Sequence, residues 1–426
     1  MKAMGPVPAD FQANSGKRLM IGDAIHPYAA VGWNEETPIF LYDWSVAARR
    51  IERLRAAMPD ELLIHYAVKA NPFEPIVQGM AGRCDGLDLA SGGELAAVLK
   101  AGVRAISTEQ EGKARPGGKG PLALSLAGPG KRDSELEAAL QHDVTVHVES
   151  SNELERLLVL AARMGVTPKV GIRVNPPFGL KGSGMKMGGL ASQFGVDHEE
   201  VPGLVRRIVA AGATWQALHV YSGSQSLSAD AIIESQRATV QLCADIAEAA
   251  VRSPVEVNLG GGFGIPYFAG DRPLDVEAIG AALADTLTNR PLVLRQSRFI
   301  LELGRYLVGE CGVYLTRVID RKVSRGKTFL VVDGGLHHML AASGNFGQLL
   351  RRNYPVAVAH RFGAEPEEEV SVVGCLCTPL DLLADEVMLP RAEVGDVIAI
   401  FCAGAYGLSA SPQAFLSQGA AREVLV

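Results

Sequence analysis

The chain has 426 residues, 48% of them hydrophobic, which is enough for two or three domains with large cores. Its formal net charge is −6 with no basic stripe, and no apolar run reaches the roughly 20 residues of a membrane helix. These features argue against nucleic-acid and membrane partners, and because the N-terminal segment lacks the apolar centre of a secretory signal, we expect a cytoplasmic protein.

A short apolar run near the N-terminus, Ile39–Asp43, is the first predicted strand. From residue 61 to about 302, short apolar runs alternate with helical patterns, and several runs are apolar on both faces, as buried parallel strands are. The predicted strands of this stretch are Leu62–Val68, Cys84–Asp88, Leu122–Leu126, Val144–Val148, Lys169–Val174, Trp215–Tyr221, Val255–Leu259 and Arg298–Glu302. Eight βα units in a row predict an α/β fold, a (β/α)8 TIM-like barrel.

The helices between these strands have start and stop signals. Two S-x-x-E capping boxes lie at Ser91–Glu94 and Ser150–Glu153, and Gly102 and Gly165 follow helical stretches as C-caps. The segment Glu109–Gly120 is rich in Gly, Lys and Glu and is predicted to be a surface insertion before the third strand.

Beyond residue 305 the pattern changes to short runs separated by turn residues, with few helical periods. The predicted strands are Gly312–Ile319, Thr328–Asp333, Val370–Gly374 and Val397–Phe401. Together with the N-terminal strand they predict an antiparallel β domain built from both chain ends. The expected organisation is an N-terminal segment 1–43, the barrel 44–304 and a C-terminal β domain 305–426.

A lysine at the end of the first barrel strand is the first candidate for chemistry. Lys69 closes the segment HYAVK, and active sites of such barrels lie at the C-terminal ends of the strands. A charged amine is costly to bury there. Lys69 is therefore either a surface lysine just past the strand or a neutral nucleophilic amine, as Schiff-base lysines are.

Polar residues also close other predicted strands. Asp88 ends the second strand, and His219 lies near the end of Trp215–Tyr221, as a core residue or as a flat ring for a flat cofactor. Glu302 ends the last apolar strand and needs a cationic partner if buried, such as a protonated pyridine nitrogen. Arg305 is a candidate for holding phosphate or carboxylate.

Three consecutive glycines, Gly260, Gly261 and Gly262, follow the strand that begins at Val255. They form either a plain turn or a cradle of bare N–H groups for a phosphate, and phosphate sites in these barrels favour the last strands.

Metal-site signals are weak. Cys375 and Cys377 form a C-x-C without a second ligand pair, and adjacent residues such as His337 and His338 rarely chelate one metal. We expect no metal site.

The motifs HYAVKANP, LDLASGGELAAVLKAG, HVYSGSQ, NLGGGFG, ELGR, CTPLD and GAYG occur in this order. As a set they resemble the alanine-racemase-fold (fold-type III) pyridoxal-phosphate-dependent decarboxylases of the ornithine, arginine and diaminopimelate decarboxylase family. The resemblance runs from about Thr37 to Val426. It implies pyridoxal 5'-phosphate as cofactor and an amino acid as substrate.

The resemblance implies roles for the barrel residues. Lys69 is similar to the lysine that carries the cofactor as a Schiff base, and Asp88 to the acid near that lysine. His219 matches the residue stacked on the pyridine ring, and Glu302 matches the partner of its nitrogen. Racemases of this fold usually have arginine in place of this glutamate, so Glu302 favours decarboxylation over racemisation. The matches near the cofactor phosphate are Ser222, Gly260, Gly261, Gly262, Gly304 and Arg305.

The resemblance also implies a homodimer with shared active sites. Cys377 resembles a cysteine that reaches across the dimer to protonate the substrate carbanion, and Tyr406 resembles a tyrosine from the partner chain that contacts phosphate. The expected substrate residues are Thr378, Asp381, Tyr406 and Arg352, with Arg351 and Lys186 as further candidate anion contacts.

One position departs from the family pattern. Diaminopimelate decarboxylases carry glutamate directly after the cysteine and ornithine decarboxylases carry aspartate, and these acids face the distal amine of the substrate. Here the residue is Thr378, which cannot pair with an ammonium. An unpaired buried charge costs about 2–5 kcal/mol, which argues against a free diamino acid.

The sequence resembles instead a smaller branch with CTPxD, which shares KMGG (186–189), QFG (193–195), GGGFGIPYF and DGGLHH. That branch includes butirosin-type decarboxylases of carrier-protein-tethered aminoacyl groups and exosortase-associated decarboxylases. We therefore expect decarboxylation of an amino acid that is tethered to a carrier or neutral at its distal end. Decarboxylation of diaminopimelate or another free basic amino acid, racemisation, and a non-catalytic homologue remain as alternatives.

Overall fold

Eight of the described strands form one closed parallel sheet, in the order β4, β5, β6, β7, β8, β11, β13, β14, with β14 paired back to β4. The computed structural model describes residues 2–21, 37–104, 122–180, 184–186, 189, 191–346, 348 and 350–426. The barrel strands are β4 (Leu63–Ala67), β5 (Gly86–Leu89), β6 (Ala123–Leu126), β7 (Thr145–Val148), β8 (Lys169–Asn175), β11 (Thr214–Val220), β13 (Glu256–Asn258) and β14 (Arg298–Leu303). The predicted (β/α)8 barrel is confirmed.

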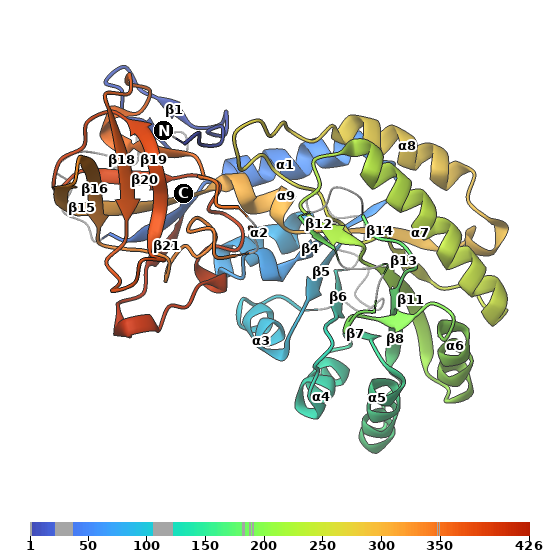
Figure 1. Cartoon of the computed structure of the whole chain (residues 1–426). Helices are drawn as coiled ribbons and strands as arrows, with labels where there is room; N and C mark the ends of the chain where they lie inside the picture. The colour runs from blue at the N-terminus through green and yellow to red at the C-terminus, as the bar shows by residue number, and fades with distance from the viewer. Residues whose placement is uncertain are drawn as a thin grey trace. The chain divides into compact units, whose positions relative to one another are not determined.

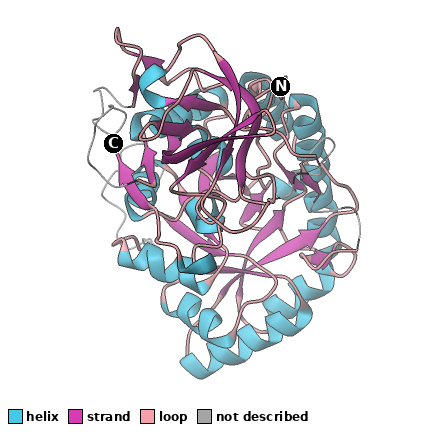
Figure 2. Cartoon of the chain, turned by 60° about the vertical axis from the view of Figure 1, so that its left-hand side comes forward, coloured by secondary structure: helices cyan, strands magenta, loops and turns pink. Residues whose placement is uncertain are grey.

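Helices lie outside these strands, as Figure 1 shows for α3 to α8 and as can be followed in Figure 2, where helices are cyan and strands magenta. They are α1 (Trp44–Ala57), α2 (Glu74–Arg83), α3 (Gly92–Lys100), α4 (Asp133–Gln141), α5 (Ser151–Met164), α6 (Val201–Ala210), α7 (Ala229–Ala250) and α8 (Val276–Thr288). Short strands β9 (Met185–Lys186) and β12 (Gly223–Ser224) pair with each other, and β10 (Val196–Asp197) pairs with β8. Among the described helices, none is long and apolar enough to span a membrane.

The serine N-caps of the two predicted capping boxes are present, whereas Glu94 and Glu153 accept from the amides of Ala90 and Glu149, one residue before each cap. Ser91 accepts a hydrogen bond from the Glu94 amide at 3.2 Å, and Ser150 accepts one from the Glu153 amide at 3.1 Å. Each serine satisfies a backbone N–H that the first helical turn leaves without a partner. Gly165 ends α5 in the left-handed conformation with φ 68°, as expected of a C-cap glycine.

The second sheet joins both chain ends. Its strands are β3 (Ile39–Tyr42), β15 (Gly312–Ser324), β16 (Lys327–Val332), β17 (Val356–Val358), β18 (Glu368–Val373), β19 (Leu382–Leu389), β20 (Val397–Ile400) and β21 (Arg422–Leu425). The sheet is mixed rather than purely antiparallel as predicted, because β16 pairs parallel with β18 and β21 pairs parallel with β3. A two-stranded hairpin of β1 (Gln12–Ala13) and β2 (Leu19–Met20) precedes it.

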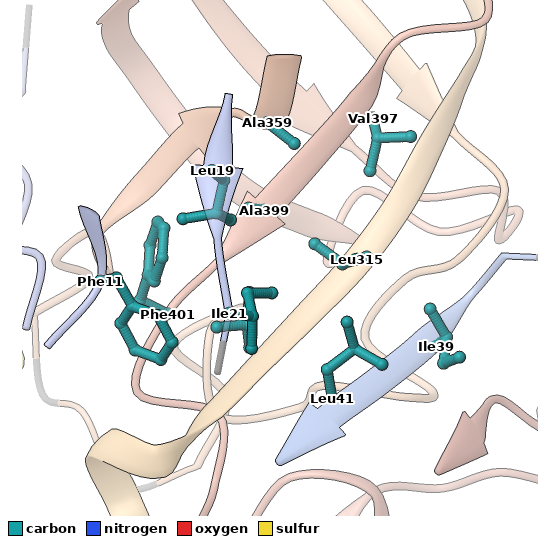
Figure 3. Close-up of a cluster of buried hydrophobic side chains, with 11 residues drawn as sticks. Phe11, Leu19, Ile21, Ile39, Leu41, Leu315, Ala359, Val397, Ala399 and Phe401 are labelled. Atoms are coloured by element: carbon teal, nitrogen blue, oxygen red, sulfur yellow. The ribbon is translucent and has the colours of Figure 1, made fainter. Parts of the chain in front are cut away.

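A hydrophobic cluster explains why the N-terminal segment belongs with this sheet. In Figure 3, Ile39 and Leu41 lie on β3 beside Leu315 of β15. Leu19 packs into the same cluster and is fully buried. Burying each such side chain contributes about 1.5–3 kcal/mol, so the N-terminal residues supply a substantial part of this core.

The chain divides into two compact units, one of Met1–Arg50, Ile265–Pro273 and Arg305–Val426 and the other of Ile51–Gly264 and Leu274–Gly304. This division is more interleaved than the segments 1–43, 44–304 and 305–426, which stay a prediction. The predicted insertion Glu109–Gly120 lies outside the described residues.

Candidate active site

Lys69 follows β4 directly, in a short 3-10 turn formed by Val68–Ala70. Its Nζ donates a hydrogen bond to Glu302 Oε1 at 3.0 Å and lies 5.0 Å from the centre of the Tyr221 ring. The lysine side chain is 38% exposed, whereas that of Glu302 is 4% exposed. The amine is therefore both held by a buried acid and accessible to a reactant.

Glu302, near the end of β14, is the buried acid of this pair. Burial alone would raise the pKa of Glu302, but the Lys69 ammonium and His219 outweigh that effect and hold this pKa well below its usual value. His219 Nε2 lies 2.9 Å from Glu302 Oε2, yet neither atom has a hydrogen-bond partner of good geometry among the described residues. Glu302 thus carries a negative charge with one oxygen open to a further donor.

Asp88 lies on β5 and is also buried. Its Oδ1 accepts a hydrogen bond from Ser125 and lies 3.2 Å from His65 Nδ1, while Oδ2 has no partner among the described residues. Glu302 and Asp88 are therefore two buried acids of the barrel that each lie beside a histidine.

The three glycines after β13 lie where no side chain fits. A Cβ at Gly261 would lie 1.9 Å from the Glu302 carbonyl oxygen, and one at Gly260 would lie 2.5 Å from the Val220 carbonyl oxygen. Gly260 and Gly262 have φ of 69° and 83°, a region that favours glycine. These glycines bring bare backbone against β11 and β14.

Two further predicted phosphate residues lie in the same unit. Ser222, which follows β11, shares a hydrogen bond of 2.7 Å with Ser235. Gly304 follows β14, and a Cβ there would lie 2.6 Å from that of Ala70. Gly304 therefore lets the end of β14 pack on the turn that carries Lys69.

Gly261→Ala is expected to lower the free energy of unfolding by more than about 2 kcal/mol, because the added Cβ strikes backbone rather than a flexible side chain. Gly203→Ala is the matched control, since nothing lies within 4 Å of a Cβ at that helical position. Urea unfolding of both variants checks this, and equal stability of the two would contradict it.

In the other unit, Arg305 lies against aromatic rings. Its guanidinium is 4.6 Å from the centre of the Tyr406 ring and donates a hydrogen bond to Tyr267 Oη at 2.9 Å. Burial raises the pKa of Tyr267 to about 12, so this hydroxyl stays neutral. Tyr406 contacts Arg305 of its own chain, and its expected action from the partner chain stays a prediction.

The CTPLD segment forms a turn in which Cys377 is exposed. Asp381 holds this turn in place, because its Oδ1 accepts a hydrogen bond from the Leu336 amide at 2.6 Å and its Oδ2 accepts one from the Leu376 amide at 2.8 Å. Its contact with substrate stays a prediction. Thr378 Oγ1 accepts a hydrogen bond from the Leu380 amide at 3.3 Å. The side chains of Thr378 and Asp381 thus accept hydrogen bonds from backbone amides in and next to the turn that carries Cys377.

Asp381→Ala is expected to loosen this turn and lower turnover by at least about tenfold, because two buried amides lose their acceptor. Asp320→Ala is the control, since that residue lies on the exposed part of β15. Turnover and the labelling rate of Cys377 by a thiol reagent are the two measurements. An unchanged labelling rate together with unchanged turnover would contradict the positioning role.

Two of the predicted anion contacts are described, Arg351 and Arg352. Arg352 is exposed, with its guanidinium 3.8 Å from the centre of the Phe268 ring. Arg351 donates to the Leu382 carbonyl, and burial lowers its pKa. The side chain of Lys186 lies outside the described part of the chain.

The rings of His337 and His338 are tilted by 44° to each other, with their centres 3.8 Å apart. His338 contacts Tyr314 Oη and the Gly419 carbonyl, at 3.2 Å and 2.7 Å. Within the described residues, no three His, Cys, Asp or Glu side chains gather as a metal site would require.

Sequence reasoning missed three residues around the two barrel acids. His65 and His147 point into the barrel, a placement that the alternation of side chains along each strand could have indicated. Glu94 was interpreted only as a capping residue, yet it lies within electrostatic range of Lys69 and Glu302, and burial raises its pKa.

Comparisons with known proteins agree with this geometry. The family model described as "Pyridoxal-dependent decarboxylase, pyridoxal binding domain" matches residues 45–309. The L-glutamyl-[BtrI acyl-carrier protein] decarboxylase of Niallia circulans is 36% identical over 92% of this chain and 89% of that protein. The diaminopimelate decarboxylase of Archaeoglobus fulgidus is 31% identical over 88% of this chain and 85% of that protein.

Solved structures lead to the same group. The diaminopimelate decarboxylase of Helicobacter pylori, complexed with L-lysine, has 27% identity and a TM-score of 0.78, with 92% of each chain covered. Because the family model matches more than half of the chain, the protein belongs to the pyridoxal-dependent decarboxylases. These enzymes use pyridoxal 5'-phosphate to remove a carboxylate from an amino acid.

Proposed function

We propose that this enzyme decarboxylates an amino acid whose distal end carries no free charge, and that this amino acid is an aminoacyl group on a carrier protein. The observation that carries the proposal is the turn around Cys377. Its neutral Thr378 stands directly after the cysteine, and both carboxylate oxygens of Asp381 are occupied by backbone amides.

A free diamino acid needs an acceptor for its distal ammonium, and leaving such a charge buried and unpaired costs about 2–5 kcal/mol. Thr378 has no carboxylate, and each oxygen of Asp381 already accepts a hydrogen bond from a backbone amide. An acyl chain attached to a carrier has no distal charge at that end, so a neutral residue suits it. The similarity to a decarboxylase named for an L-glutamyl carrier-protein substrate supports this choice.

A free basic amino acid is the second candidate, because diaminopimelate decarboxylases also match most of the chain. It requires an acid from elsewhere to replace the missing carboxylate at Thr378.

The barrel residues fit pyridoxal phosphate. An accessible amine at Lys69, an open buried oxygen on Glu302 and a buried imidazole at His219 suit its aldehyde, its ring nitrogen and its ring face. The bare backbone at Gly260–Gly262 suits its phosphate. When bound, the cofactor supplies an electron sink for the charge left at Cα.

The roles proposed for the chain's own groups follow. Lys69 Nζ would hold the cofactor through its aldehyde, and a substrate amine would take the place of this amine. Glu302 would pair its negative charge with the protonated ring nitrogen of the cofactor. In the structure the Lys69 ammonium occupies the place of that cation. His219 lines the ring face, while Asp88, Ser222, Gly304 and Arg305 are assigned to the cofactor's surroundings.

We assign Cys377 as the proton donor to Cα in the active site of a partner chain, which makes the homodimer the working unit. Tyr406 keeps its predicted role as a contact of the cofactor phosphate from the partner chain, and the Arg305 guanidinium of its own chain lies 4.6 Å from its ring centre. Arg352 is retained as a candidate contact for an anionic tether. The cytoplasmic location stays a prediction.

A CO2-release assay tests the proposed substrate. The panel comprises free meso-diaminopimelate, lysine, ornithine, arginine and glutamate, and glutamyl and related aminoacyl groups loaded on carrier protein. We expect turnover on a loaded carrier and at least about 100-fold less on any free diamino acid, which corresponds to about 3 kcal/mol. Efficient turnover of a free diamino acid would overturn the tethered substrate.

A further inference from the structure

The barrel contains a buried acid–imidazole pair, His65 and Asp88, in addition to the pair of Glu302 with His219. His65 Nδ1 of β4 is 3.2 Å from Asp88 Oδ1 of β5, and the two residues are 2% and 6% exposed. An ionised carboxylate can only accept, so a hydrogen bond between these atoms requires that Nδ1 carry the proton. Asp88 thus fixes the orientation of the imidazole.

The sequence makes room for this ring. Gly86 stands opposite His65 in the β4–β5 register, and a Cβ at Gly86 would lie 2.5 Å from His65 Nε2. The three atoms nearest to that Cβ all belong to the His65 ring. Space for the imidazole therefore explains the glycine at this strand position.

The charges around His65 favour its protonated form. Burial lowers the pKa of His65, but Asp88 outweighs it, with help from Glu256 and Asp85, so this pKa lies above its usual value. Glu302 stands opposite His65 in the β14–β4 register. His65 therefore lies on the strand between the two strands that carry the barrel acids.

One further titratable group faces this region. The His147 pKa lies well below its usual value, chiefly through burial and then through His219, while Glu302 opposes the shift and His65 adds to it. His147 is thus the neutral counterpart of His65, and it too sits against a glycine: a Cβ at Gly171 would lie 2.4 Å from His147 Nδ1.

We propose that His65 is a positioning residue of the active site, which as an imidazolium balances the Asp88 carboxylate and fixes its rotation, so that the charge of Lys69 is left to Glu302. The inference rests on the proposed function of Lys69 and Glu302. Ser125 shares Asp88 Oδ1 with His65, which leaves Oδ2 as the free end of the acid. Removing the imidazolium would leave the buried Asp88 carboxylate without a cation, opposite Ala67 and two residues before Lys69 in the β4–β5 register.

Histidine-labelled full-length protein, as purified, tests the charge directly by NMR titration of its nine histidines. The His65 signal is identified by its loss in His65→Asn. We expect an imidazolium that persists above pH ~6.5, the ordinary value, and that loses its proton at least about one pH unit lower in Asp88→Asn. A neutral His65 at pH ~6, or an unchanged titration in Asp88→Asn, would overturn the proposal.

A variant series separates positioning from simple packing. His65→Leu removes the donor and the charge, whereas His65→Asn keeps a donor near the Nδ1 position. We expect kcat to fall at least about tenfold in His65→Leu, with partial rescue in His65→Asn and little change in KM. A loss of stability with unchanged kcat and pH profile in both variants would mean a packing role only.

The glycines supply matched controls if His65→Leu fails to fold. Gly86→Ala should displace His65, shift its NMR signal and move the pH profile, and its effect should be smaller in the His65→Asn background. Gly171→Ala crowds His147 equally and should leave the His65 signal in place. The NMR measurement does not depend on turnover. Absence of CO2 release in the assay would therefore count against the proposed substrate and not against the role of His65. Equal effects of the two glycine variants on the His65 signal would refute the inference.

Discussion

Lys69→Ala is expected to abolish covalent attachment of the cofactor and to lower decarboxylation by at least about 10³-fold, or about 4 kcal/mol of activation barrier. The reason is geometric: the Lys69 amine is accessible at the end of β4 and is held 3.0 Å from a buried acid. Borohydride reduction, denaturation and gel filtration, with absorbance read on the protein fraction, measure attachment independently of activity.

The barrel offers a matched control. Lys131, like Lys69, is paired with a buried glutamate, with its Nζ 2.6 Å from Glu153 Oε1. Unlike Lys69 it is buried, and it also donates to the carbonyls of Gly128 and His147. Lys131→Met should lower stability, because breaking a buried pair leaves an uncompensated acid, and should retain covalent cofactor. The assignment of Lys69 as the attachment site would be contradicted if the Lys69→Ala variant still carried covalent cofactor. It would also be contradicted if covalent cofactor were lost only in Lys131→Met.

Glu302→Gln is expected to lower kcat by about 10²- to 10³-fold, since glutamine is isosteric but cannot hold a cation at the cofactor's ring nitrogen. The low pKa of Glu302 keeps the acid ionised throughout the neutral range. Steady-state kinetics on the loaded carrier measure the effect, and Glu153→Gln is the control for loss of a buried carboxylate. A kcat within twofold of the wild type would contradict the role.

The same variant has a pH signature in stability. Because the folded pKa of Glu302 is depressed below its unfolded value, the carboxylate stabilises the fold above about pH 4.5, and this contribution is lost as the pH falls. The advantage of the wild type over Glu302→Gln in unfolding free energy should therefore be present at neutral pH and shrink on acidification. Urea unfolding between neutral pH and pH ~4 measures this difference.

The barrel was predictable because its signals are local. Each of the eight strands lies within one or two residues of its predicted bounds, since apolar runs of strand length between capped helices leave little freedom. Lys69 and Glu302 were found because a charged residue at the end of an apolar strand needs a partner. The structure pairs these two residues with each other.

The β domain was less predictable because its pairings are long-range. The parallel pairing of β21 with β3 joins residues nearly four hundred positions apart, and no local pattern encodes it. The role of Asp381 in holding the turn was missed for a similar reason, since one of its two partners, the Leu336 amide, lies 45 residues away in the sequence. His65 was overlooked because its partner Asp88 lies on the next strand.

The most direct test of the proposed chemistry is mass spectrometry of an aminoacyl-loaded carrier incubated with the enzyme in deuterated water. We expect the acyl group to lose one CO2 and to gain one deuterium at Cα, with neither change in Lys69→Ala. Deuterium at Cα without loss of CO2 would mean racemisation, and no change on the loaded carrier, together with CO2 release from a free diamino acid, would contradict the proposed substrate.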